Sequence, residues 1–266
     1  MDQINNIKLF VLDLDGTFYL GDRLFPYSLR FLERARETGR RVLFFSNNSS
    51  KTPRLYIAKL RGMGVEATRA DIMTSGDVCI DYLKKHHGGA SVFLMGTEAL
   101  CDEFAAAGIR AVTYANPETR WTPDVVVCAF DTELTYRKLE RACTFIRDGA
   151  VFLATHEDIN CPTETGFLPD CGSMCAAISL STGKAPKYLG KPHKETVDMI
   201  LAHTGAAPGE TAFIGDRLYT DVACGVNNGA VGLLVLSGEA KAEDLALSSI
   251  VPDGVFSDLG EIADLL

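Results

Sequence analysis

Short apolar runs alternate along the chain with longer segments whose apolar positions recur at helical spacing. Ile7–Asp13 and Arg41–Phe45 are nearly continuous apolar runs, which is typical of strands buried on both faces of a parallel sheet. Helical spacing follows each run, over residues 26–39 and 53–62, and a further strand–helix pair spans residues 71–85. This alternation predicts βαβ units and an α/β fold.

The same alternation restarts in the middle of the chain. Strand–helix pairs are predicted within residues 91–107, 124–147 and 150–182. A helix, strand, helix and strand then follow over residues 192–236. The chain is thus a Rossmann-like parallel-sheet protein with a second α/β segment inserted into it.

Two loops rich in Gly, Lys and Pro bracket the inserted segment, at residues 86–90 and 183–187. We interpret them as hinges. The predicted core domain therefore comprises residues 1–80 and 185–266, and the inserted domain comprises residues 81–184.

The composition is that of an ordinary globular protein, and it argues against several classes of binding partner. Apolar residues make up 47% of its 266 residues and charged residues 23%. Lys and Arg number 26 against 35 Asp and Glu, a net charge of −9, which argues against nucleic-acid and membrane-surface partners. No apolar run approaches the roughly 18 residues that span a bilayer, and Met1–Asn6 does not begin a signal peptide.

The eight cysteines are too sparse for a disulfide framework in a chain of this length. Cys171 and Cys175 lie four positions apart, no Cys-x-x-Cys pair occurs, and we therefore expect no zinc site. Buried, reduced thiols in a cytoplasmic protein are the favoured interpretation.

The first candidate site is the Asp13-Leu14-Asp15-Gly16-Thr17 segment at the end of the first predicted strand. Open α/β sheets bind ligands at the carboxyl ends of their strands. Asp13 and Asp15 are expected to project to one side, where two carboxylates about 4 Å apart would repel by roughly 4 kcal/mol. A proton, a bound cation or a turn at Gly16 must offset that repulsion; two solvated loop aspartates are the alternative.

Three further segments carry candidate chemistry, each with a simpler alternative. Ser46 and Asn47 begin a polar Ser-Asn-Asn-Ser segment that suits a phosphate oxygen or a helix cap. Lys191 precedes a proline at a helix start, where it is a fixed cation or an exposed lysine. Asp216 ends an apolar strand and Asp221 follows five positions later; both could complete an oxygen site for Mg²⁺, or Asp221 could cap the next helix.

The four segments in this order resemble the motifs of the haloacid dehalogenase-like (HAD) hydrolase superfamily. The resemblance covers most of residues 7–80 and 185–238. The insert lies between Ser46 and Lys191, an arrangement similar to the NagD-like or p-nitrophenylphosphatase-like branch, subfamily IIA. The resemblance implies a HAD core with an inserted α/β cap domain that decides the substrate.

The same resemblance implies a role for each motif residue. Asp13 would be the nucleophile that forms an aspartyl-phosphate, and Asp15 the general acid and base. Lys191 would bridge the nucleophile and the phosphate, and Ser46 with Asn47 would bind the phosphate oxygens.

The implied cofactor is Mg²⁺. Its ligands would be the Asp13 carboxylate, the backbone carbonyl of Asp15 and Asp216, with Asp221 as a supporting residue. The ion would supply the positive charge that a carboxylate needs to attack a phosphate dianion.

In the inserted domain, His156 and Asp158 lie in a segment that usually reads Thr-Asn-x-Asp in this branch, and are candidate substrate contacts. His156 replaces the asparagine, and Asp170-Cys171-Gly172-Ser173 stands where a Gly-x-Gly-Ser turn is common. Specificity therefore cannot be carried over from relatives. A surface histidine and a turn-forming aspartate are the alternatives for His156 and Asp158.

The expected function is Mg²⁺-dependent hydrolysis of small phosphomonoesters: sugar phosphates, glycerol-type phosphates or p-nitrophenyl phosphate. The partner is then a small phosphorylated metabolite, and a homodimer through the cap is the oligomer known in this branch. A phosphotransferase or mutase with the same aspartyl-phosphate, and a phospho-metabolite sensor without turnover, are the alternatives.

Overall fold

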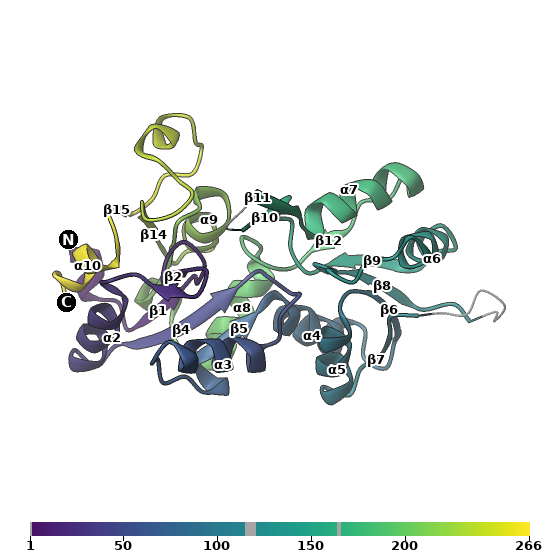
Figure 1. The fold of residues 1–266 in the computed structure, drawn as a ribbon, viewed down its shortest axis with the longest axis horizontal. Coiled ribbons are helices and arrows are strands. Elements are labelled where there is room, and N and C mark those ends of the chain that lie inside the picture. The colour runs from purple at the N-terminus through teal and green to yellow at the C-terminus, as the bar shows by residue number, and fades with distance from the viewer. Residues whose placement is uncertain (1, 115–120, 164–165) are drawn as a thin grey trace. The chain divides into compact units, whose positions relative to one another are not determined.

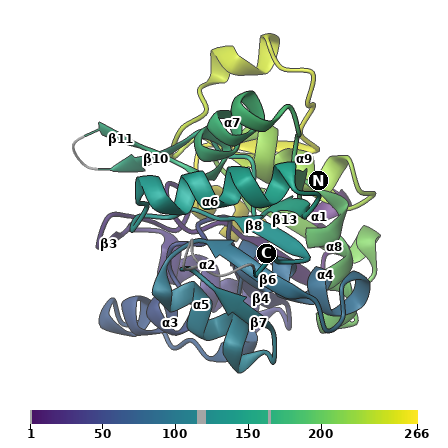
Figure 2. The same ribbon diagram turned by 90° about the vertical axis from the view of Figure 1, so that its right-hand side faces the viewer.

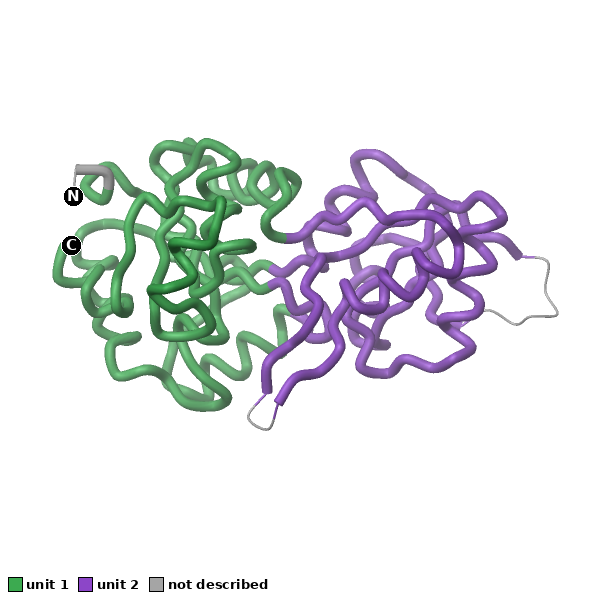
Figure 3. Tube along the Cα trace, turned by 90° about the horizontal axis from the view of Figure 1, so that it is seen from above, with its two compact units in different colours: residues 1–46, 53–73, 191–266 green, residues 47–52, 74–190 purple. Residues whose placement is uncertain are grey.

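The computed structural model describes residues 2–114, 121–163 and 166–266, which form two compact units. The first unit comprises residues 1–46, 53–73 and 191–266, and the second comprises residues 47–52 and 74–190 (Figure 3). None of the described helices combines the length and apolar character that a bilayer span requires.

The boundaries of the units differ from the predicted domain boundaries at 80/81 and 184/185. Helix α4 (Ser75–His86) belongs to the second unit, where Gly76 lies directly against the side chain of Leu100. The short segment 47–52 also belongs there, because the Ser49 hydroxyl accepts a hydrogen bond from the backbone N–H of Phe130 (2.9 Å). The predicted boundaries were placed at loops identified by their composition. The contacts of α4 and of residues 47–52, which composition does not show, decide which unit each segment joins.

A six-stranded parallel sheet forms the centre of the first unit, in the order β15-β14-β13-β1-β4-β5 (Figure 1). Its strands are β1 (Leu9–Leu12), β4 (Arg41–Ser46), β5 (Ile72–Thr74), β13 (Thr211–Gly215), β14 (Val231–Val235) and β15 (Gly254–Phe256). From β1 the chain winds outward through β4 and β5, whereas from β13 it winds the other way. The strand order therefore reverses between β1 and β13, and a doubly wound sheet binds its ligand at such a point.

Helices and turns cover this sheet because their apolar stripes match it. In α2, for example, Phe31 and Ala35 are buried, and Phe31 meets Phe10 of β1 edge to face at 5.4 Å between ring centroids. The helices of the unit are α1 (Asp2–Asn5), α2 (Ser28–Glu37), α3 (Pro53–Gly62), α8 (Lys194–Thr204), α9 (Ala223–Val226) and α10 (Leu259–Ala263). A small hairpin, β2 (Tyr19–Leu20) with β3 (Arg23–Leu24), follows β1.

The second unit is built on its own parallel sheet, in the order β12-β9-β8-β6-β7. Its strands are β6 (Ser91–Met95), β7 (Arg110–Val112), β8 (Val125–Cys128), β9 (Val151–Ala154) and β12 (Lys187–Tyr188). The strand order reverses here as well, between β6 and β8. The predicted α/β class is confirmed for both units.

Helices α6 (Tyr136–Arg147) and α7 (Cys171–Thr182) lie side by side over one face of this sheet (Figure 2). Helix α5 (Glu98–Ala106) connects β6 to the edge strand β7. A hairpin of β10 (Asn160–Thr163) and β11 (Gly166–Pro169) precedes α7. Sequence patterns predicted α4 to α8 within a few residues but missed β7, β12 and both hairpins, because such short strands carry too few apolar positions to define a period.

Candidate active site

The carboxyl ends of β1 and β13 bring two predicted site residues together at the switch point of the first sheet. Asp13 directly follows β1, and its backbone N–H donates to the carbonyl of Ile214 in β13 (2.9 Å). Asp216 follows β13 directly. One oxygen each of Asp13, Asp216 and Asp221 lies within 4.8 Å of the others. The site therefore joins chain segments about 200 positions apart.

Lys191 is the charged centre of this cluster. Its Nζ donates to Asp13 Oδ1 (2.7 Å) and to Asp221 Oδ1 (2.6 Å), and to the Phe45 carbonyl at the end of β4 (3.4 Å). Only 4% of the lysine side chain is exposed. Burial would lower the pKa of Lys191, but the two carboxylates outweigh it and raise the pKa above its usual value, so the ammonium stays charged at neutral pH.

Fixed donors also orient the other two carboxylates. Asp216 Oδ2 accepts the backbone N–H of Glu239 (2.7 Å), and its Oδ1 accepts the hydroxyl of Thr17 (3.4 Å). Asp221 Oδ2 accepts the backbone N–H of Arg217 (3.1 Å), so protein groups bind both of its oxygens. The donors on Asp216 are neutral, whereas Asp221 is already paired with the Lys191 ammonium. Asp221 therefore fits a supporting role better than Asp216 does.

The cluster has more negative than positive charge. Three carboxylates surround one ammonium, which leaves two negative charges without a counter-charge when all of them are ionised. Burial raises the pKa of Asp13 well above its usual range; Lys191 opposes that shift, and Asp221 and Asp216 reinforce it. Burial and the nearby Asp221 raise the pKa of Asp216 to about 6.

These residues fit a hard divalent cation. Carboxylate oxygens are the ligands that Mg²⁺ prefers, and a dication would neutralise the two excess charges. Asp13 and Asp216 each keep one oxygen directed at the cluster, and no sulfur or imidazole belongs to it. The chemistry of the donor set therefore agrees with the cofactor predicted from the sequence.

Asp15 lies apart from this cluster. Its side chain is exposed and accepts a hydrogen bond from the Tyr19 hydroxyl (3.3 Å). The chain turns at Gly16, whose φ of +88° is a conformation that side chains strain to adopt, and a Cβ there would overlap the Asp216 carboxylate. Repulsion between Asp13 and Asp15 could be offset by a proton, a bound cation or a turn at Gly16, and the structure contains the turn.

The predicted phosphate-binding residues belong to different units. Ser46 ends β4 in the first unit, is buried, and has its hydroxyl 3.1 Å from that of Tyr56. Asn47 belongs to the second unit, where its side-chain amide donates to Asp158 (3.3 Å) and its carbonyl accepts the Ser75 hydroxyl. A phosphate contact by the Asn47 side chain would compete with the bond to Asp158.

His156 is fully buried in the second unit, and both of its ring nitrogens have partners. Nε2 lies 2.9 Å from Asp170 Oδ1, and Nδ1 lies 3.0 Å from the Thr155 hydroxyl. Asp170 also caps α7, since it accepts the backbone N–H of Cys171 (2.6 Å). The surface-histidine alternative is wrong, because the side chain is buried and its nitrogens hold the loop to α7. A substrate contact by His156 stays a prediction, and a substrate would have to displace these partners.

Several residues of the two clusters were missed by sequence reasoning. Glu239 and Thr17 contribute through a backbone N–H and a hydroxyl, groups that most positions in a chain possess. Asp170 looked like a departure from a turn pattern, and Tyr19 was not singled out. Among these residues, the sequence offered a signal only at Asp170. This position departs from the family pattern together with His156, and a histidine and a carboxylate can bind one another.

Comparison with known proteins agrees with this geometry. Haloacid dehalogenase-like hydrolases match residues 10–110, and a second HAD-like hydrolase description matches residues 188–262. An acid sugar phosphatase of Staphylococcus aureus (strain MRSA252) is 34% identical over 259 residues, which cover 97% of this chain and 98% of that protein. The chain belongs to the haloacid dehalogenase-like hydrolase superfamily.

Solved structures narrow the assignment. The 4-nitrophenylphosphatase of Thermotoga maritima is 45% identical with a TM-score of 0.92, over 98% of each chain. A putative NagD protein is 41% identical with a TM-score of 0.90, over 98% of this chain and 99% of that one. Within the superfamily the chain is a member of the NagD-like and p-nitrophenylphosphatase-like branch, subfamily IIA, as the motifs predicted.

A third relative was solved with metal ions. The glycerol phosphate phosphatase of Mycobacterium tuberculosis, in complex with magnesium, is 32% identical with a TM-score of 0.89, over 99% of this chain and 79% of that one. The same protein was also solved in complex with calcium.

The His156–Asp170 pair makes stability depend on pH. Burial lowers the pKa of His156, but Cys171, Asp170 and Asp158 together raise it to about 9, above the ordinary value of 6.5. The stabilisation is therefore complete below pH 6.5 and is lost as pH rises through about 9, with an upper limit of about 3 kcal/mol. Thermal unfolding between pH 6 and pH 10 measures this loss, which we expect to shrink in Asp170→Asn.

Asparagine also caps helices, so Asp170→Asn removes the charge while keeping the cap of α7. Asp148→Asn, an exposed carboxylate in the same unit, is the matched control and should keep the wild-type pH dependence. If Asp170→Asn and wild type lose the same stability between pH 6 and pH 10, the ion pair does not contribute as described.

Proposed function

We propose that this HAD-type hydrolase is a Mg²⁺-dependent phosphatase of small phosphomonoesters, with sugar phosphates and glycerol-type phosphates as the substrate class. Two relatives that match nearly the whole chain are an acid sugar phosphatase and a glycerol phosphate phosphatase. All eight cysteines are free thiols, which agrees with a reducing compartment such as the cytoplasm.

The observation that carries the proposal is the buried Lys191 ammonium between Asp13 and Asp221. A carboxylate that accepts a hydrogen bond from a buried cation has a fixed direction, and the cation opposes the protonation that burial favours. Asp13 is thereby an oriented anion at a ligand-binding edge of the sheet. A phosphate sensor could bind with cations alone and would have no use for such an anion.

In the proposed reaction an oxygen of Asp13 attacks the phosphorus atom, the ester oxygen leaves, and an aspartyl-phosphate forms. Lys191 contacts the nucleophile and stabilises negative charge on the transferring group. Asp15 donates a proton to the departing alcohol and afterwards takes one from the water that hydrolyses the acyl phosphate. The Tyr19 hydroxyl orients Asp15 for these two transfers.

Asp13 and Asp216 would hold the divalent cation, with Asp221 in support. The bound ion would neutralise charge between the carboxylates and the phosphate oxygens. Ser46 would donate its hydroxyl to one phosphate oxygen, since it lies at the end of β4 beside the Phe45 carbonyl that Lys191 contacts. The second unit, with Asp158 in its loop, would select the alcohol portion.

Asp13→Asn should reduce phosphate release by about four orders of magnitude or more, because the amide is no nucleophile. Ser46→Ala should lose about 10²- to 10³-fold in kcat, the usual cost of one transition-state donor. Steady-state assays of inorganic phosphate release from a panel of sugar and glycerol phosphates measure both effects.

The control for these two variants is Asp198→Asn, an exposed carboxylate on α8 that should keep wild-type rates. Circular dichroism confirms that each variant is folded. Normal turnover by folded Asp13→Asn would show that Asp13 is not the nucleophile. Inactivity of the wild type on the whole panel would contradict the phosphatase proposal.

Chelation should abolish activity, and added Mg²⁺ should restore it. Because a dication relieves the excess charge among Asp13, Asp216 and Asp221, Mg²⁺ should also stabilise the fold, by roughly 2.7 kcal/mol at one hundred times its Kd. Differential scanning calorimetry with and without Mg²⁺ measures this independently of turnover.

Asp216→Asn should weaken the Mg²⁺-dependent rise in Tm and shift it to higher Mg²⁺ concentrations. Asp253→Asn, a carboxylate that binds the backbone N–H of Gly232 away from the cluster, is the matched control. An equal rise in Tm for wild type and Asp216→Asn would show that the ion binds elsewhere.

A further inference from the structure

The second unit contains a hollow that the reaction above does not use. It has a volume of about 280 Å³, close to the lower limit for small-molecule sites. Phe93 of β6 lines it together with Glu98, Glu133, Arg137 and Arg141. We call this hollow the switch-point pocket.

Its place in the sheet is the one where α/β proteins bind ligands. The strand order of the second sheet reverses between β6 and β8. Glu98 begins α5, directly after β6, and Glu133 lies in the loop between β8 and α6. The pocket therefore lies at the carboxyl ends of the two strands that flank the switch point, as Asp13 and Asp216 do in the first unit.

Two arginines line the pocket, and one of them is incompletely paired. The Nε of Arg141 is buried, and among the residues that the structure describes it has no hydrogen-bond partner. Its guanidinium lies over the ring of Phe145, 4.4 Å from the centroid, which fixes its plane. Arg137, one helical turn earlier, donates to the Tyr114 hydroxyl (3.2 Å). A planar guanidinium with an unpaired Nε matches the two oxygens of a carboxylate.

Two glutamates line the same pocket. Glu133 Oε2 accepts the backbone N–H of Glu98 (2.9 Å), and the Glu98 side chain also lines the pocket. Lys138, the remaining cation, already binds Asp131 with two hydrogen bonds of 3.0 and 3.2 Å. The pocket thus offers two arginines and two glutamates, so a ligand that carries both charges satisfies it better than an anion alone.

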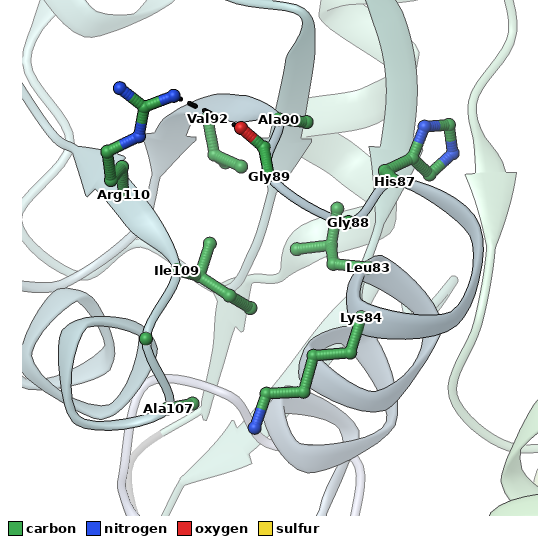
Figure 4. Close-up of a pocket in the computed structure, with 11 residues that line it drawn as sticks. Leu83, Lys84, His87, Gly88, Gly89, Ala90, Val92, Ala107, Ile109 and Arg110 are labelled. Atoms are coloured by element: carbon green, nitrogen blue, oxygen red, sulfur yellow. Dashed lines mark hydrogen bonds between the residues drawn. The ribbon is translucent and has the colours of Figure 1, made fainter.

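A second hollow in the same unit shows the contrast (Figure 4). It lies at the amino ends of β6 and β7, measures about 140 Å³, and is lined by residues around these ends, Gly88 and Gly89 among them. Its Arg110 donates to the Gly89 carbonyl (3.1 Å), and no carboxylate lines it. Position and chemistry both distinguish the switch-point pocket from this hollow.

We propose that the switch-point pocket binds a small zwitterion of the free α-amino-acid class. Arg141 and Arg137 take the carboxylate, Glu98 and Glu133 take the ammonium group, and the side chain of the ligand lies against Phe93. The second unit then carries a ligand site of its own, separate in its residues from the phosphatase site.

The test is titration calorimetry of the full chain with single amino acids as probes, together with two analogues of each. The 2-oxo acid lacks the ammonium group and the decarboxylated amine lacks the carboxylate; inorganic phosphate is the third comparison. We expect saturable binding of at least one amino acid, and binding at least about tenfold weaker for its analogues and for phosphate.

Arg141→Gln and Arg137→Gln should each weaken amino-acid binding about tenfold. Glu98→Gln should weaken binding of the amino acid but not binding of the 2-oxo acid, which has no ammonium group. Arg137 is exposed, so its variant is informative even if Arg141→Gln fails to fold. Lys84→Gln and Arg110→Gln, in the hollow of Figure 4, are matched controls that should bind as wild type.

The proposal fails if no amino acid binds at millimolar concentration, if phosphate or a 2-oxo acid binds as tightly as the amino acid, or if Arg137→Gln leaves binding unchanged. The same titration with Asp13→Asn should give the wild-type Kd. The outcome is therefore independent of whether the chain is a phosphatase.

Discussion

The ammonium of Lys191, buried between Asp13 and Asp221, is the interaction on which the first unit's site depends. It joins three segments, because Asp13 follows β1, the Phe45 carbonyl lies in β4, and Asp221 lies in the helical turn after β13. A buried cation without these partners would cost several kcal/mol. The lysine therefore stabilises the carboxylates, and the carboxylates in turn keep the lysine charged.

Much of the first unit could be predicted because its site residues follow buried strands directly. Apolar runs ending at Asp13, Ser46 and Asp216 identify strand ends, and parallel strands bring those ends to one edge. The N–H of Glu239 on Asp216 could not be predicted, because any non-proline residue offers that donor. The boundary at residue 74 also depends on packing of α4, which composition does not report.

The second unit was harder to predict because its polar residues act in pairs across long sequence distances. His156 and Asp170 each looked like an isolated departure from a family pattern, yet they bind one another. Arg141 lies on a helix with several other charged residues, and the Nε without a hydrogen-bond partner among the described residues distinguishes it. Which side chains bind one another, and which polar atoms lack a partner, depends on the folded chain. A pattern along the sequence therefore cannot predict either.

The anchoring of His156 has a consequence for how such a protein can diversify. The loop next to α7 is held by a buried ion pair and by Gly172, where any side chain would overlap the carbonyl of Glu157. Ile159 and Phe167 beside it are 57% and 72% exposed. Mutations at these exposed positions leave the anchor intact, so selection can alter what the loop contacts without first finding mutations that restore its shape. The anchored part of the loop is thereby what leaves the neighbouring exposed positions free to change.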